Sequence, residues 1–457
     1  MITHRHEIEQ SEQAKRSIEA AIAAMKELKI SQFLHQANIR MVREDICGIL
    51  STLITVIFMK CTMYQLLNSK DKWNYSSKNT YYRLLNNKSF NWFKFLFLLS
   101  EFVTSYFSKL TSANRPGLFV IDDSTIHKDR SKKAELLAKT YDHVIGKYCK
   151  GYTLLTLGWT DGFSFVPVTF NMLSSPNQRN RYNEIPDTLD HRTNAYKFRK
   201  ESMMHKPDAV MLMLERAIKA GICAKYVLMD TWFTTSPLIG HIRQLGLHVI
   251  GMVKLGNQQY KYNGKKYTLE QLYRLSWKHA HSNVLGSVLA ETKAGTPVKL
   301  VFIRNRNKKS EWLCILSTDL TLEAEEIVRL YGNRWSIECF FKASKSCLKL
   351  GKEYQNRDYS TTVSSTAIVF TRYILLEWIR RKENDDRTYG ELFLLLCDEV
   401  RDMTYEEAIK ELLSFIWDGA KTFGDKITKM IKSKVTEWVE SQHRFYGLLE
   451  VFLKWES

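Results

Sequence analysis

Three acidic residues, Asp122, Asp230 and Glu338, are of the type that holds divalent metal ions for phosphodiester chemistry. The apolar runs 117–121 and 226–229 precede the two aspartates, which predicts that each aspartate stands at the end of a β-strand. In α/β sheets, ligands gather beyond the carboxyl ends of the strands, so two such carboxylates can share cations. Oxygen-only ligands suit Mg²⁺ or Mn²⁺, and a pair of these ions can activate a water or a 3′-hydroxyl. Taken singly, each aspartate is better explained as a turn former or a helix cap.

A second group of reactive side chains follows in a segment predicted to be helical. At about 100° per residue, four of them fall within roughly a 60° arc: Tyr331, Arg334, Glu338 and Lys345. One helix face would therefore present a phenol, a guanidinium, a carboxylate and an ammonium. An ordinary surface pair between Arg334 and Glu338 is the simpler explanation, but it accounts for two of the four residues.

The spacing of these four residues, Tyr-x2-Arg-x3-Glu-x6-Lys, resembles the Tyr-Arg-Glu-Lys signature of the insertion-sequence-four family of bacterial DDE transposases. The sequences Asp122-Asp123-Ser124 and Leu228-Met229-Asp230, each after a predicted strand, agree with that family. A β-rich insertion before the glutamate agrees as well. The resemblance covers residues 115–350 and reaches the flanking helical parts only in general character.

The resemblance implies a ribonuclease-H-like catalytic core in which Asp122, Asp230 and Glu338 would hold two Mg²⁺ ions, or Mn²⁺. In such a transposase, water nicks one strand at the transposon end, and the freed 3′-hydroxyl attacks the opposite strand to form a hairpin. A second water opens the hairpin before the 3′-hydroxyl attacks target DNA. The implied substrate is double-stranded DNA. Joining two ends implies a homodimer on that DNA, at the nucleoid in the bacterial cytoplasm.

The first member of the acidic trio has two candidates. Asp122 and Asp123 both fit the family pattern of an aspartate with a hydroxyl residue two positions on, here Ser124 or Thr125. We favour Asp122 because it follows the apolar run directly. Neighbouring strand residues face opposite sides of a sheet, so we expect one of the two aspartates to be a ligand, and Asp123 stays open as the alternative.

The resemblance also implies contacts with DNA. Tyr331, Arg334 and Lys345 would bind phosphates near the cut, where arginine suits a bidentate contact and lysine acts as a point charge. Trp312, shortly before the signature, resembles the tryptophan that holds the unstacked base of the hairpin, and an aromatic platform suits that purpose. A role for Trp312 as a strand core residue stays open.

Two other functions remain open at this point. The first is a Mg²⁺-dependent, ribonuclease-H-like nuclease that cuts without strand transfer, because metal chemistry alone does not separate it from a transposase. The second is a non-catalytic DNA-binding regulator, and the three intact acids argue against it.

The elements that must position these residues predict an α/β fold. The order strand, hairpin, helix, strand, helix, strand over residues 117–253 fits a mixed sheet with helices on its faces. The hairpin is predicted from Asp161-Gly162, which lies between two runs rich in β-branched and aromatic residues. Five parts follow: a helical N-terminal region (1–112), the first part of a catalytic core (113–254), a β-rich insertion (255–316), the second part of the core with the signature helix (317–360), and a helical C-terminal region (361–457).

The charge of the chain indicates a polyanionic partner. Its 67 lysine and arginine residues against 49 acidic residues give a net charge of +18, which suits nucleic acid. In the N-terminal region, Ser77 is the predicted N-cap of a helix that ends at Leu85, and Lys78 and Arg83 on that helix are candidate DNA contacts. The alternative is a solvated helix in a helical bundle.

Eight cysteines, none of them in a CxxC spacing, predict reduced and mostly buried thiols of a cytosolic protein, without a zinc motif. An uncharged and largely apolar run, residues 46–59, has 14 residues. A bilayer span needs about 20, so we predict a buried helix there and no membrane partner.

Overall fold

The computed structural model describes residues 19–41, 44–59, 62–69, 72–111, 115–276, 283–305, 308, 311–354 and 356–382. The chain divides into two compact units, and the unit formed by residues 19–57 and 61–393 contains the described helices and strands. The predictions for residues 1–18 and 383–457, which include most of the helical C-terminal region, lie outside the described residues.

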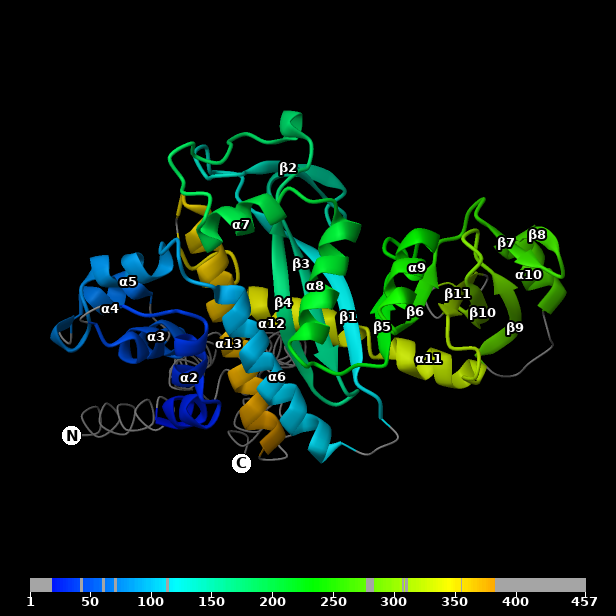
Figure 1. Ribbon diagram of the computed structural model, residues 1–457, viewed down its shortest axis with the longest axis horizontal. Helices are drawn as coiled ribbons and strands as arrows, with labels where there is room; N and C mark the ends of the chain where they lie inside the picture. Colours follow the sequence, from blue (N-terminus) through cyan, green and yellow to red (C-terminus); the bar gives the residue numbers. More distant parts are fainter. Residues whose placement is uncertain are drawn as a thin grey trace, which may run out of the picture. The chain divides into compact units, whose positions relative to one another are not determined.

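An 11-stranded mixed sheet forms the centre of this unit (Figure 1). The strands lie in the order β2-β3-β1-β5-β6-β11-β10-β9-β7-β8, and β4 pairs with β3. β1, β5 and β6 run parallel to one another. The strands of the predicted core are β1 (Leu118–His127), β2 (Ala138–Asp142), β3 (Lys147–Thr160), β4 (Phe165–Leu173), β5 (Tyr226–Met229) and β6 (His248–Val253). This large mixed sheet, flanked by helices, confirms the predicted α/β class.

The predicted hairpin is the one between β3 and β4, which pair antiparallel along their length. Its loop is longer than a two-residue turn, because Asp161 Oδ1 accepts the backbone N–H groups of Phe163 and Ser164 at 3.0 and 2.8 Å. Gly162 takes a positive φ of 85°, which glycine adopts without a steric penalty. The Asp-Gly pair therefore marks the turn correctly.

β1 is longer than the apolar run predicts, so Asp122 and Asp123 lie within the strand and not at its end. Antiparallel pairing with β3 continues from Leu118 to His127. The ladder satisfies the backbone groups of this polar half, so no apolar pattern is needed to keep it extended. The predicted order has no further strand between the first strand and the hairpin, but this segment contains β2 and the start of β3, because cross-strand pairing makes strands there.

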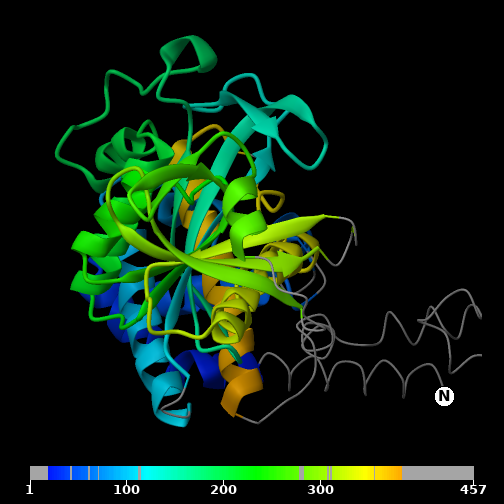
Figure 2. The same ribbon diagram turned by 90° about the vertical axis from the view of Figure 1, so that its right-hand side faces the viewer.

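The predicted insertion supplies five strands that extend the same sheet (Figure 2). β11 pairs antiparallel with β6, and β10, β9 and the β7–β8 hairpin follow outward. The helix α10 (Leu269–Ser276), which was not predicted, interrupts the β pattern of the insertion and packs on β9. The strands are β7 (Gln259–Tyr262), β8 (Lys265–Thr268), β9 (Val284–Glu291), β10 (Pro297–Arg304) and β11 (Trp312–Ser317).

Two long helices, α6 (Trp92–Leu110) and α13 (Tyr359–Lys382), pack on each other and on β4. α13 is buried on all sides, as expected of a helix in the middle of a core. α12 (Trp335–Ser346) contacts α13, β1 and β4. The remaining helices that cover the sheet are α7 (Asn194–Glu201), α8 (Lys206–Lys219), α9 (Ser236–Gln244) and α11 (Ala324–Gly332).

In its described residues the N-terminal region contains α2 (Ile30–Gln36), α3 (Ile46–Thr55), α4 (Met63–Leu67) and α5 (Lys78–Leu85). Ser77 caps α5 by accepting the Thr80 N–H, as predicted. The predicted helix over residues 46–59 instead ends at Thr55, because the Arg372 side chain satisfies the carbonyls of Leu53 and Ile54 there.

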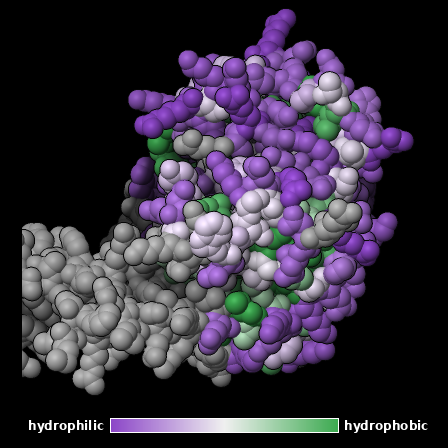
Figure 3. All heavy atoms as spheres, turned by 90° about the vertical axis from the view of Figure 1, so that its left-hand side faces the viewer, coloured by the Kyte–Doolittle hydropathy of each residue, from purple (hydrophilic) through white to green (hydrophobic). Residues whose placement is uncertain are grey.

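The described cysteines are free thiols, in agreement with the prediction: Cys47, Cys149, Cys223, Cys314, Cys339 and Cys347. The prediction that most of them are buried is wrong for this part of the chain, because only Cys149 and Cys314 lie on strands inside the sheet and are buried. Within the described part of the chain, no helix combines the length and the apolar character that crossing a bilayer requires. Hydrophilic residues cover most of the described surface on the face shown in Figure 3.

Candidate active site

The parallel pairing of β1 with β5 brings the two aspartates together. Val120 pairs with Leu228, so two residues further along Asp122 stands level with Asp230, the residue that follows β5. Asp230 Oδ1 accepts the backbone N–H groups of Trp232 and Phe233 at 3.0 and 3.1 Å, which orients its carboxylate at the strand end. The register of two buried strands thus places the first two acids side by side.

Arg334 joins the third acid to the first. Its Nη1 donates to Asp122 Oδ2 at 2.9 Å, and its Nη2 donates to Glu338 Oε1. The side chains of Arg334 and Asp122 are only 17% and 15% exposed, so this pairing is largely withdrawn from solvent. The Tyr331 ring lies beside the same guanidinium, 6.0 Å from its Cζ atom. Residues from β1, α11 and α12 therefore meet at one point.

The site concentrates negative charge in a partly buried place. Burial raises the pKa of Asp122 to about 7; the Arg334 guanidinium opposes this rise, and the Asp230 carboxylate adds to it. Burial likewise raises the pKa of Tyr331 to about 12, with Arg334 opposing and Asp230 adding. Two neighbouring carboxylates each disfavour the ionised form of the other. A bound cation would stabilise both ionised forms.

Asp123 faces away from this group. Its carboxylate forms an ion pair with Lys206 at the start of α8, and the Lys206 ammonium lies 4.6 Å from the centre of the Trp232 ring. The alternation of side chains along β1 separates the two adjacent aspartates, as the sequence predicts. The sequence carried no signal for Lys206 as the partner, because this contact depends on how α8 packs on the sheet.

Lys345 contacts the same strand as Asp122. Its Nζ donates to Ser124 Oγ at 2.6 Å and to the Thr125 carbonyl at 3.1 Å. Burial lowers the pKa of Lys345, and the nearby Asp142 carboxylate opposes that change. The last residue of the signature is thereby held against β1, two residues beyond the first acid.

The signature segment is not one continuous helix, which corrects the prediction. α11 ends at Gly332 and α12 begins at Trp335. Between them, the N–H groups of Asn333 and Arg334 donate to the carbonyls of Leu330 and Tyr331, which is the tighter i to i−3 pattern of a 3₁₀ turn. Glycine and asparagine are weak helix formers, which explains the break at this position. Three of the four side chains still meet, because the Arg334 guanidinium contacts both Tyr331 and Glu338. Lys345 lies instead against Ser124 and Thr125 of β1.

Trp312, the first residue of β11, lies in the extended part of the sheet and not among the acids. Its indole stacks on Tyr273 of α10, with ring centres 4.6 Å apart and planes 20° apart, and packs edgewise against Phe302. Trp312 also lines a cavity of about 410 Å³ together with residues of the segments 255–257 and 268–270. An aromatic pair beside an open cavity can serve as a platform for a planar ligand.

Lys78 and Arg83 lie on α5, which packs against α13. Arg83 forms an ion pair with Glu44 at 2.6 Å, and the Lys78 ammonium lies 5.8 Å from the Tyr82 ring centre. The charge of Arg83 is thus partly balanced within the chain. Among the described residues, no hydrogen bond or ion pair joins these two side chains to the acidic group.

Two protein families match this chain. Residues 62–264 match the family described as "DDE superfamily endonuclease", and residues 209–356 match the one described as "Archaeal putative transposase ISC1217". The first match includes Asp122 and Asp230, and the second includes Asp230 and Glu338. No curated protein matches the chain. The mixed sheet flanked by helices is in keeping with the ribonuclease-H-like core of such enzymes.

Proposed function

We propose that this chain, whose DDE endonuclease and transposase domains make it a DNA-cleaving enzyme, is a cut-and-paste transposase of the insertion-sequence-four type. The observation that carries the proposal is the Arg334 bridge from Asp122 to Glu338, with Asp230 level with Asp122. The bridge joins two of the acids through the signature arginine, and the strand register places the third acid beside Asp122. Those are the residues that the Tyr-Arg-Glu-Lys resemblance assigns to catalysis.

DDE enzymes use divalent metal ions, and the residues present fit Mg²⁺ or Mn²⁺. Asp122, Asp230 and Glu338 offer carboxylate oxygens without nitrogen or sulfur, the donor set that these hard cations prefer. When bound, two such ions activate the attacking water or 3′-hydroxyl and stabilise the leaving oxygen of the phosphodiester. The three acids are therefore proposed as the metal ligands, with Asp122 and not Asp123 as the first.

The basic members of the signature are proposed to hold DNA phosphates. A guanidinium has five N–H donors, enough for Arg334 to hold two carboxylates and a phosphate oxygen together. The Lys345 ammonium is fixed by Ser124 and Thr125, so it supplies a point charge beside β1, two residues along the strand from Asp122. Tyr331 lies beside the Arg334 guanidinium as a neutral phenol, and burial, which raises the pKa of Tyr331 to about 12, extends its neutral range to higher pH.

Replacing Arg334 tests the phosphate assignment. We expect Arg334→Ala to weaken binding to DNA and to lower the salt dependence of the affinity by about one charge. Arg334→Lys is the matched control, because it keeps the charge and so should keep the salt slope while lowering cleavage through loss of the two-carboxylate bridge. Filter or anisotropy binding at several salt concentrations measures both slopes. Equal slopes for Arg334→Ala and the unaltered protein would contradict the phosphate contact.

Trp312 is proposed to hold the unstacked base of the hairpin intermediate. An unstacked base needs an aromatic surface and space beside it, and Trp312 offers an indole next to a cavity of about 410 Å³. Tyr273 behind the indole holds it in place at a ring separation of 4.6 Å. Base-on-aromatic stacking contributes about 1–3 kcal/mol per base.

We therefore expect Trp312→Ala to slow hairpin formation by about 5- to 150-fold, the factor that 1–3 kcal/mol of lost stacking represents. The first nick should change much less, since it precedes base extrusion. Denaturing gels of end-labelled DNA separate nicked from hairpin products. Trp73→Ala, at an exposed tryptophan outside the extended sheet, is the control. An equal loss of nicking and hairpin formation in Trp312→Ala would instead assign Trp312 to the core.

The decisive test of the function uses DNA that carries the ends of the element, with Mg²⁺. Nicked, hairpin and joined products support the transposase. Cleavage without hairpins or joined ends identifies a nuclease that lacks strand transfer, and tight binding without cleavage identifies a regulator. Joining two ends requires two copies of the chain on one DNA complex, so the product-forming complex should have the mass of a dimer on DNA.

A further inference from the structure

A second group of metal-ligating side chains lies outside the acidic site, where β1 ends. It consists of His127, the last residue of β1, together with Asp129 and Cys149, a residue of β3. A ring nitrogen, a carboxylate oxygen and the thiol sulfur of these residues lie within 4.8 Å of one another. Nothing in the proposed transposase chemistry uses this group.

The strand register explains why the three side chains meet. His127 pairs with Gly151, and the Lys128 N–H donates to the Lys150 carbonyl at 2.8 Å, which continues the ladder beyond the end of β1. Asp129 therefore stands opposite Cys149, and its Oδ1 accepts the Lys150 N–H at 2.9 Å. Residues two apart on a strand share a face, so His127 points to the same side as Asp129.

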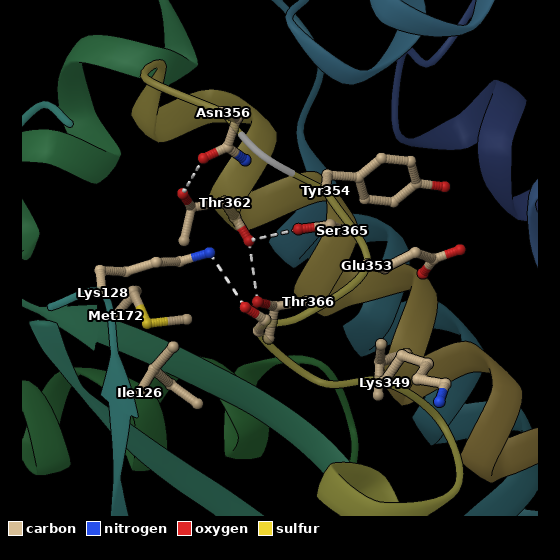
Figure 4. A pocket seen from close by; sticks show the side chains of 12 residues that line it. Ile126, Lys128, Met172, Lys349, Glu353, Tyr354, Asn356, Thr362, Ser365 and Thr366 are labelled. Atoms are coloured by element: carbon tan, nitrogen blue, oxygen red, sulfur yellow. Dashed lines mark hydrogen bonds between the residues drawn. The ribbon is translucent and has the colours of Figure 1, made fainter. Parts of the chain in front are cut away.

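Lys128, between the two ligands, points to the other face. Its ammonium donates to the Gly351 carbonyl at 2.9 Å, in the small pocket that Figure 4 shows. That contact anchors the strand end on the loop after α12. The backbone that carries His127 and Asp129 is thus held in place independently of any ion.

Asp142 of β2 orients the imidazole. Its Oδ2 lies 2.6 Å from His127 Nε2, and its Oδ1 accepts the Val144 N–H at 2.8 Å. A buried carboxylate on Nε2 favours a proton there and leaves the lone pair on Nδ1, the nitrogen that faces Asp129 Oδ2 at 3.2 Å. A carboxylate behind the histidine is the arrangement that positions histidine ligands of zinc.

We propose that His127 Nδ1, the Asp129 carboxylate and the Cys149 thiolate bind one Zn²⁺ ion, with water as the fourth ligand. Mixed nitrogen, oxygen and sulfur donors suit Zn²⁺, whereas Mg²⁺ avoids thiolate. Binding releases the thiol proton of Cys149 to solvent, since the thiolate is the ligand. His127 and Asp129 are 40% and 57% exposed, so the ion can enter from solvent with Cys149 behind them. The ion would tie β1, the strand that carries Asp122, to the β2–β3 hairpin.

The test measures metal binding by the full-length protein after chelator treatment, in excess Mg²⁺ so that the acidic site is occupied. We expect one Zn²⁺ per chain in competition with a chromophoric chelator, and a thiolate-to-metal absorption band when Co²⁺ replaces Zn²⁺. Cys149→Ser and His127→Asn should abolish the band. Asp142→Asn should weaken Zn²⁺ binding by about 10- to 100-fold, the usual effect of losing such an outer partner.

Matched variants make the result specific. Cys223→Ser removes an exposed cysteine outside the group and should leave the band unchanged. Asp129→Asn alters a side chain that is 57% exposed, so it should fold even where Cys149→Ser does not, and it should also weaken binding. Absence of Zn²⁺ binding, or a Co²⁺ band that persists in Cys149→Ser, would overturn the proposal and leave His127 as a metal-independent ion-pair partner of Asp129 and Asp142.

Discussion

Asp122→Asn is expected to lower DNA cleavage by at least about 10³-fold, whereas Asp123→Asn, at the next residue, should leave most of it. The two aspartates face opposite sides of β1: Asp122 meets Arg334 and Asp123 meets Lys206. Losing one carboxylate from a two-metal site removes about 4 kcal/mol or more of transition-state stabilisation, which corresponds to that factor. The rate of nicking in Mg²⁺ on end-labelled DNA measures the difference.

Asp123→Asn is the closest control that the chain offers, because it changes the same group one position along the same strand. Asparagine has nearly the same shape and keeps an oxygen that can accept from the Lys206 ammonium, so this variant should still fold. Asp230→Ala and Glu338→Gln should behave like Asp122→Asn and retain DNA binding. If Asp123→Asn were the inactive variant, the first ligand would be Asp123 and the assignment of Asp122 would be wrong.

The largest expected effect on stability comes from Arg372→Ala in the middle of α13. The Arg372 side chain is fully buried, and its guanidinium holds the Glu353 carboxylate in a bidentate pair at 2.7 and 2.8 Å. It also donates to the carbonyls of Leu348 and Ile54, which ties α13 to the loop after α12 and to the end of α3. Removing it leaves a buried carboxylate and carbonyls without donors, which costs about 3–5 kcal/mol.

Urea denaturation followed by circular dichroism measures this effect as a lower unfolding midpoint. Arg329→Ala is the matched control, because Arg329 also makes a two-bond pair with a glutamate, Glu326 on α11, but is about half exposed. That exposed pair should contribute no more than about 1 kcal/mol. If the two variants unfolded at similar urea concentrations, the buried Arg372–Glu353 pair would contribute no more to the stability of the protein than the exposed Arg329–Glu326 pair.

Local patterns predicted much of the fold because their causes are local. Ser77 caps α5 through the backbone three residues on, and Asp161-Gly162 closes the β3–β4 hairpin through its own loop. The burial of β5 and β6 follows from their continuous apolar composition. The break at Asn333 and the helix α10 were missed although both have local causes: Gly332 and Asn333 are weak helix formers, and α10 is rich in leucine, glutamate, glutamine and arginine, which are strong ones.

Two features follow from the sequence by itself, because residue type and separation along a chain do not depend on the fold. They are the strands before the two aspartates and the spacing of Tyr331, Arg334, Glu338 and Lys345. The tertiary structure alone decided which side chains meet. Parallel register sets Asp122 level with Asp230, α12 brings Arg334 onto both acids, and the β1–β3 ladder sets Cys149 opposite Asp129. Apart from the Arg334–Glu338 pair, whose members are four residues apart, each of these contacts joins residues that are distant in sequence. Such a contact depends on the packing of whole strands and helices, which no local pattern encodes.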